Sequence, residues 1–242
     1  MRLNRPDRLN ALTPNLLSLF LSELDRACAA GARAVLITGE GRAFCSGADL
    51  AGEGGIVADL GETLEAWYHP VMTRLAALDI PVVCAVNGPA VGAGVALALA
   101  ADIVLMARSA YLQLGFVNIG LVPDAGATWL IAKSAGRAKT LEMALLGERM
   151  SAEDARDCGL VARIVDDEAL FDEALAIARR LAVGPSLAIG LIRKQVAAAL
   201  NLTQAETLAL EAANQSEAGK TADFREGVTA FREKRLPEFR GR

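Results

Sequence analysis

The sequence has a single histidine, His69, and its four cysteines lie far apart along the chain. Cys28, Cys45, Cys84 and Cys158 form no Cys-x-x-Cys pair, so no metal site is predicted. Scattered cysteines within apolar runs are typical of reduced thiols in a protein core. We therefore expect a cytoplasmic protein without structural disulfides or bound metal.

Basic residues are not in excess, because the 242 residues include 25 Lys and Arg and 29 Asp and Glu. This balance excludes the basic footprint of a nucleic-acid-binding domain. The opening residues, MRLNRPDRLN, lack the apolar run of a secretory signal. The mostly apolar stretch 80–107 is interrupted by Asn-Gly-Pro and contains Asp102, so we interpret it as two buried strands around a helix. Neither nucleic acid nor membrane is expected as a partner.

Apolar residues make up 53% of the chain, and they follow two alternating patterns. The continuous apolar run at 81–86 is typical of a strand covered on both faces, and 102–107 is predicted to be another strand. Helical patterns occupy 10–31, 62–78 and 95–101, and Thr13 with Pro14 favours the start of the first. The alternation predicts an α/β core over 1–185, with 52–61 as a loop, followed by amphipathic helices over 186–242.

Three glycine-rich turns each follow a predicted strand and are expected to open a helix. They are TGEGRAFCSGAD at 38–49, NGPAVGAG at 87–94 and IGLVPDAGA at 119–127. Backbone N–H groups at the start of a helix attract negative charge, so two such turns aimed at one point would hold an oxyanion. The alternative is that these glycines only make tight turns. The segment 92–97 lacks the third glycine of a dinucleotide-binding loop, so we predict no such cofactor.

Asp124 is the single acid in the apolar stretch GLVPDAGATWL at 120–130. A carboxylate among apolar neighbours loses hydration, which raises its pKa and suits it to acid/base chemistry. The alternative is that its side chain caps the following helix by accepting from N–H groups near Ala127.

Several segments occur in the order and spacing of a known family. They are LNRPDRLNAL (3–12), GRAFCSGADL (41–50), PVVCAVNGPAVGAGVALALAADIVLMA (81–107), GLVPDAGAT (120–128) and EGVTAFREKRLPEF (226–239). Through them nearly the whole chain resembles the crotonase (enoyl-CoA hydratase/isomerase) superfamily. The resemblance implies a core of stacked ββα units, a helical C-terminal region for trimerisation and cover of the CoA site, and an acyl-CoA substrate. It also implies a homotrimer or dimer of trimers, and no cofactor, since coenzyme A is part of the substrate.

The same resemblance assigns the oxyanion donors to the backbone N–H groups of Ala48 and Ala93. These donors hold the thioester oxygen as an enolate forms. Gly47, Gly92 and Gly94 permit the close approach of the chain that this requires.

The departures from the family pattern indicate the reaction. Crotonase hydratases use two glutamates, whose positions align here with Ala96 and Phe116, and neither side chain transfers a proton. Asp124 is the acid that remains, at a turn where several branches of the superfamily place a working aspartate. These are the isomerase branch of phenylacetate-type degradation, the 1,4-dihydroxynaphthoyl-CoA synthases and the 4-chlorobenzoyl-CoA dehalogenases. GLVPDAGATWL is most similar to the isomerase branch, which implies that Asp124 shifts a C=C bond.

Further binding residues follow by analogy with the family. His69 aligns with the base of the dehalogenase branch, and we interpret it as a wall of the acyl pocket beside Phe116, with a direct chemical role as the alternative. Phe231 and Lys234 match family residues near the CoA adenine and phosphates, often across a subunit interface. Arg5 is expected near the CoA entrance.

Isomerase is therefore the leading hypothesis, and three alternatives stay open. A hydratase would need a second acid, for which Glu62 and Glu65 are candidates. A dehalogenase-like reaction would use Asp124 as a nucleophile. A non-catalytic acyl-CoA binder would keep the oxyanion turns without turnover.

Overall fold

The computed structural model describes residues 1–50 and 59–241, and within them the chain builds two sheets covered by helices. The larger sheet has the strand order β1-β2-β3-β5-β8, and the smaller one has the order β4-β6-β7. All neighbouring strands described run parallel except β6 and β7. The strands are β1 (Arg2–Leu3), β2 (Val35–Gly39), β3 (Val82–Val86), β4 (Ala90–Val91), β5 (Ile103–Ala107), β6 (Tyr111–Gln113), β7 (Arg149–Ser151) and β8 (Arg163–Val165). The α/β prediction is confirmed.

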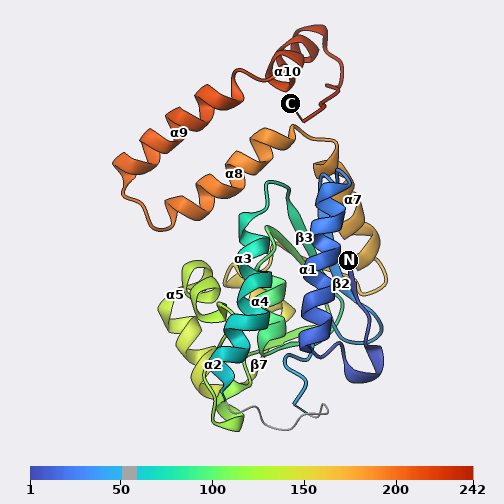
Figure 1. Ribbon diagram of the computed structural model, residues 1–242, viewed down its shortest axis with the longest axis vertical. Helices are drawn as coiled ribbons and strands as arrows, with labels where there is room; N and C mark the ends of the chain where they lie inside the picture. The colour runs from blue at the N-terminus through green and yellow to red at the C-terminus, as the bar shows by residue number, and fades with distance from the viewer. Residues whose placement is uncertain (51–58, 242) are drawn as a thin grey trace.

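The helices fall into a group around the sheets and a C-terminal group that extends away from them (Figure 1). Those of the core are α1 (Pro14–Ala29), α2 (Leu60–Thr63), α3 (His69–Ala77), α4 (Ala93–Leu99), α5 (Ala127–Leu146), α6 (Ala152–Asp157) and α7 (Leu170–Ala182). The extending helices are α8 (Ser186–Ala199), α9 (Gln204–Ala218) and α10 (Ala222–Glu233). The short turns η1 (Pro6–Arg8), η2 (Leu64–Tyr68) and η3 (Phe116–Ile119) complete the helical segments described.

The apolar stretch 80–107 forms the centre of the core, as β3, α4 and β5. Every residue of β3 is buried, because β2 and β5 flank it and both α4 and α7 pack against it. The predicted strand–helix–strand arrangement is therefore confirmed. Over the described residues no single helix has the length and apolar composition to cross a membrane, whereas the pair α7 and α8, bent by 110°, meets both criteria jointly.

Local sequence signals place some boundaries correctly and others not. The Thr13 hydroxyl accepts from the Leu16 N–H at 3.2 Å, so α1 begins as predicted. The predicted helix 62–78 is instead interrupted by the π-helical turn η2. The helix expected after the first glycine-rich turn would begin beyond Leu50, outside the described residues, and the loop predicted at 52–61 also lies mostly outside them.

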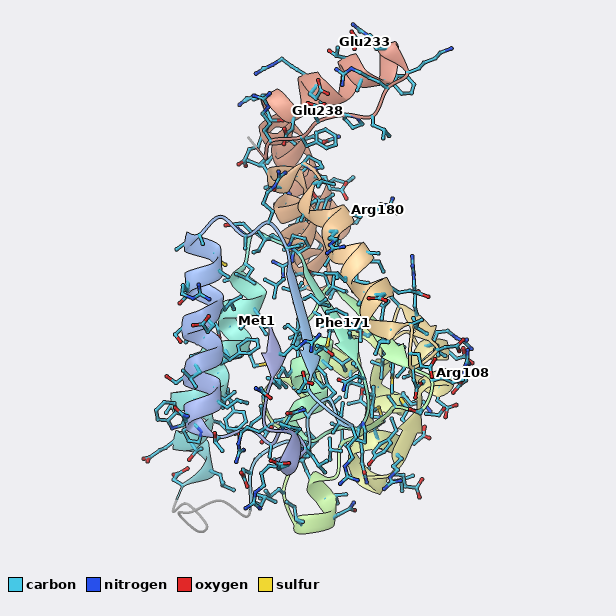
Figure 2. The ribbon with its side chains drawn as sticks, turned by 90° about the vertical axis from the view of Figure 1, so that its right-hand side faces the viewer. Met1, Arg108, Phe171, Arg180, Glu233 and Glu238 are labelled. Carbon is cyan, nitrogen blue, oxygen red and sulfur yellow. The ribbon has the colours of Figure 1, made fainter. Side chains whose placement is uncertain are left out.

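The extending helices are fastened to the core at their base. Arg193 of α8 donates to the Asp102 carboxylate at 2.5 Å and to the carbonyl oxygens of Leu75 and Leu78 at the end of α3. Arg33, after α1, binds the Ser186 hydroxyl at 2.9 Å at the start of α8. The helices beyond this attachment extend away from the core, and Figure 2 shows Glu233 and Glu238 at the end of the molecule away from Met1 and Phe171.

The packing of α4 against the chain at Cys45 yields a first prediction. A Cβ added at Gly94 would lie 2.5 Å from the Cys45 carbonyl oxygen and 2.9 Å from its Cβ. Because this neighbour is backbone in a fully buried site, we expect Gly94→Ala to lower the free energy of unfolding by about 1–3 kcal/mol. Urea denaturation measures it.

The matched control is Gly227→Ala in α10, where the new Cβ would meet only the Phe239 ring at 3.6 Å. There alanine should raise the stability by about 0.5–1 kcal/mol through its helix propensity. Equal stability of Gly94→Ala and the wild type would contradict the packing argument.

Candidate active site

Two of the glycine-rich turns lie against each other at backbone distance. Cys45 pairs with Ala90 in a parallel bridge, and the Val91 N–H donates to the Cys45 carbonyl at 2.8 Å. An ideal Cβ on Gly47 would lie 2.8 Å from the Val91 oxygen and 3.6 Å from the Ala93 nitrogen. The turns approach this closely because Gly47 has no side chain, and Ala48 and Ala93 become neighbours.

The backbone N–H groups of these two alanines are left available by the local geometry. Ala48 pairs with Leu12, whose N–H donates to Gly47 at 2.7 Å and whose carbonyl accepts from Asp49 at 3.0 Å. These bonds use the residues on either side of Ala48, so its own N–H lies on the opposite side of the chain from Leu12. Ala93 is the first residue of α4, and its N–H has no acceptor within the helix.

Asp124 lies in the loop before α5 with its side chain turned into the protein. Its Oδ1 is buried and has no hydrogen-bond partner among the described residues. Burial raises the pKa of this carboxyl from 3.8 to about 6, and the nearby His69 partly opposes the rise. An unsatisfied buried carboxylate oxygen is costly and calls for an explanation, and a proton-transfer role supplies one.

The alternative role of Asp124 as a helix cap is wrong. The Ala127 N–H donates to the backbone carbonyl of Asp124 at 2.9 Å, and not to its carboxylate. Gly126, in a left-handed conformation, occupies the cap position of α5 without a side-chain bond.

Tyr68 is a site residue that sequence reasoning missed. It is 7% exposed and ends the π-helical turn η2, a type of distortion that is frequent at functional sites. Burial, and after it the nearby negative charge of Asp124, raises the pKa of its phenol to about 12. The phenol therefore stays protonated, and it lies within electrostatic reach of both Asp124 and the turn at 45–49. The available signal was its place in the triplet Tyr-His-Pro at 68–70, which sequences of the isomerase branch often carry.

Phe116 and His69 lie on two sides of this arrangement. An ideal Cβ on Gly92 would lie 3.6 Å from Cζ of Phe116, so the ring packs beside the oxyanion turn and forms an apolar wall. His69 begins α3 and is exposed, near enough to Asp124 for its positive form to favour the carboxylate. Ala96 is fully buried within α4.

The remaining predicted binding residues are not brought to this place within one chain. Phe231 is 85% exposed on α10, and Lys234 directly follows that helix, at the end of the molecule farthest from the core (Figure 1). Arg5 does lie next to the oxyanion turn, but its guanidinium is paired with Asp49 at 2.8 Å.

The assembled groups suit proton transfer next to a carbonyl. Two N–H donors from neighbouring turns would stabilise an oxyanion, and a carboxyl group with a pKa near neutrality would accept and return a proton. The buried Cys45 has a pKa raised by burial to about 12, so its thiol is not an activated nucleophile.

Comparison with known proteins identifies the family. The profile of the enoyl-CoA hydratase/isomerase family matches residues 1–242. The chain is 45% identical to 1,2-epoxyphenylacetyl-CoA isomerase of Escherichia coli strain K12, over 100% of this chain and 94% of that protein. It is 44% identical to a probable enoyl-CoA hydratase of Rhodobacter capsulatus, over 99% and 93% of the two chains.

The fold agrees as well. The crystal structure of an enoyl-CoA hydratase from Bacillus anthracis superimposes with a TM-score of 0.94 at 31% identity, covering 100% of this chain and 94% of that one. The chain belongs to the enoyl-CoA hydratase/isomerase family.

Proposed function

We propose that this protein is an enoyl-CoA isomerase that moves a C=C bond within an acyl-CoA thioester. The observation that carries the proposal is the buried, unpartnered carboxylate oxygen of Asp124 at a site with two backbone oxyanion donors. A 1,3-shift needs one group that takes a proton and gives it back, and a single carboxylate with a pKa of about 6 meets that need.

The proposed reaction begins with a 3-enoyl thioester whose carbonyl oxygen accepts from the N–H groups of Ala48 and Ala93. Asp124 removes a proton from C2, and the electron pair moves into the C2–C3 bond as the negative charge spreads to the thioester oxygen and C4. The protonated Asp124 then returns the proton at C4, which leaves a 2-enoyl thioester. Tyr68, whose phenol stays protonated, lies near enough to feel the charge of Asp124 and forms part of the surroundings of the carboxylate.

The alternative of hydration is weaker because it needs a second acid to activate water. The two positions expected to carry it hold the buried Ala96 and the apolar wall residue Phe116. Glu62 and Glu65, offered as substitutes by the sequence, are both exposed on the segment before α3.

The acyl group is proposed to include aromatic-derived chains. The relative from Escherichia coli is named for an epoxide of phenylacetyl-CoA, and the Phe116 ring beside Gly92 offers an apolar surface for an aryl group. An aryl-substituted 3-enoyl-CoA is therefore the second substrate to assay, after an aliphatic one.

We also propose that the working unit is a homotrimer or a dimer of trimers. Large apolar side chains are exposed along the extending helices, at Ile192, Val196, Leu200, Leu208, Phe224 and Phe231. Contiguous exposed apolar surface marks an interaction site. A neighbouring copy would then bring its own Phe231 and Lys234 toward the CoA of this site, which one chain does not achieve alone.

Asp124→Asn tests the central role. The amide does not accept the substrate proton, so turnover of a 3-enoyl-CoA should fall by about 10²–10⁴-fold while the thioester still binds. The 2-enoyl product is followed by its absorbance, and binding by calorimetry.

The control for this variant is Asp172→Asn, an exposed acid in the first turn of α7. Full turnover in Asp124→Asn would overturn the role of Asp124. Binding without turnover in both variants and in the wild type would favour a non-catalytic acyl-CoA binder, and incorporation of ¹⁸O from labelled water would favour a hydratase.

The pH profile of the isomerase follows from the raised pKa. Asp124 must be ionised to remove the proton, so kcat/KM should rise with pH through about 6 and then level off. A profile that levels off already near pH 4 would contradict a buried base.

The same pKa shift predicts a pH-dependent stability. Because the folded pKa of Asp124, about 6, exceeds 3.8, its contribution to stability is full below 3.8 and is lost as the pH rises through 6. Asp124→Asn removes that loss, so its urea midpoint should exceed that of the wild type at pH 7.5, and the difference should vanish near pH 3.5. A constant difference across this range would show that the carboxylate is not the cause.

A further inference from the structure

Arg5 has both ends of its guanidinium group engaged beside the oxyanion turn. Its Nη2 lies 2.8 Å from Oδ2 of Asp49, and its Nη1 donates to the Ala11 carbonyl at 2.6 Å. The side chain of Asp49 is only 8% exposed and that of Arg5 is 29% exposed. A guanidinium that holds two short, charge-assisted bonds in a partly buried site is committed to the protein rather than directed to solvent.

The two groups held by Arg5 lie at the end of a short ladder of backbone bonds. The Ser46 N–H donates to Leu9 at 3.0 Å, the Leu12 N–H donates to Gly47 at 2.7 Å, and the Asp49 N–H donates to Leu12 at 3.0 Å. Segments 9–12 and 46–49 therefore run side by side, with Ala48 opposite Leu12. Arg5 joins their ends by binding Ala11 on one segment and Asp49 on the other.

The segment that carries this ladder has an unusual shape that must be held in place. Leu9 and Asn10 are both left-handed, with φ of +50° and +56°, although neither is glycine. Asn10 is fully buried, donates to the carbonyls of Glu40 and Ala43, and accepts from the Arg5 N–H at 2.9 Å. Residues held in such conformations persist where surrounding bonds determine them, and they cluster at functional sites.

We propose that Arg5 is a positioning residue for the oxyanion hole and acts through Asp49 on the N–H of Ala48. This inference rests on the proposed function. The ion pair has two effects. It fixes the direction of the Ala48 N–H, and it offsets the negative charge of Asp49, which directly follows the residue that binds the developing enolate. Hydrogen bonds weaken steeply as their angle departs from linear, and an unpaired negative charge nearby disfavours a second one. Arg5 thereby serves the reaction without contacting the CoA phosphates.

The first experiment compares two thioesters of one 3-enoyl group, the CoA ester and the pantetheine ester, which has no phosphate. For Arg5→Ala we expect kcat to fall by about tenfold or more, by the same factor with both esters, and KM to change little. This loss is smaller than the roughly 10²–10³-fold loss that follows removal of an oxyanion donor, because the donor is misaligned and not removed. Arg5→Lys keeps the charge but loses the paired geometry, so it should restore part of kcat. A loss confined to the CoA ester, expressed in KM, would overturn the proposal and make Arg5 a phosphate ligand.

A second experiment reads the oxyanion hole directly and does not depend on turnover. A push–pull aryl-enoyl thioester of CoA that does not isomerise absorbs at longer wavelength when donors polarise its carbonyl. We expect the red shift on binding to the wild type to shrink in Arg5→Ala and to recover partly in Arg5→Lys. An undiminished shift in Arg5→Ala would overturn the role of Arg5, whereas no shift and no isomerisation in the wild type would instead overturn the proposed function.

Two controls separate positioning from general destabilisation. Arg26→Ala breaks an exposed ion pair with Glu23 on α1, and it should leave both kcat and the red shift unchanged. Asp49→Asn should lower kcat in the wild-type background but much less in Arg5→Ala, because the two residues act through one ion pair. Fully additive losses would contradict that coupling.

Discussion

The close approach of two backbone segments is the constraint on which the rest of this structure depends. Residues 45–48 and 89–94 run within hydrogen-bond distance of each other, and a Cβ at Gly47 or Gly94 would lie inside 3 Å of the facing backbone. Hydrophobic burial assembles β3, α4 and β5, yet burial alone tolerates many spacings. The absence of two side chains sets this spacing, and the spacing makes neighbours of two peptide N–H groups that are far apart in sequence.

The surroundings of Asp124 serve reactivity at the expense of stability. The apolar neighbours that withhold a partner from its carboxylate also raise its pKa toward the value at which a proton is both taken and released readily. Tyr68, which lies near Asp124, keeps its proton because burial raises its pKa to about 12. If the Asp124 carboxylate capped α5, it would be stabilised by backbone N–H groups and would be a weaker base. The cap position of α5 is instead occupied by Gly126, which is left-handed.

Short sequence patterns predicted much of the fold and part of the candidate site. The cap at Thr13, the strand–helix–strand run at 80–107 and the acid at 124 were all predicted, because each is encoded by a few adjacent residues. Tyr68 was missed since the π-helical turn that aims it arises from packing and has no signature in its own sequence. The pairing of Arg5 with Asp49 joins residues 44 positions apart, and no spacing rule points to it. The family resemblance placed Arg5 near the CoA entrance, which stays a prediction, and nothing in the sequence indicated its contacts.

The attachment of α8 to the core at one end leaves the rest of the extending helices exposed. Arg193 and Arg33 fix where the extending helices leave the core, but the apolar residues farther out, such as Val196 and Leu208, remain open to water. Most helical stability comes from packing, so these helices gain stability when their exposed apolar residues are covered. Anything that covers those residues adds to the stability of these helices by an amount that grows with the logarithm of its concentration. The stability of the extending helices thus depends on the concentration of whatever covers them as well as on their own sequence.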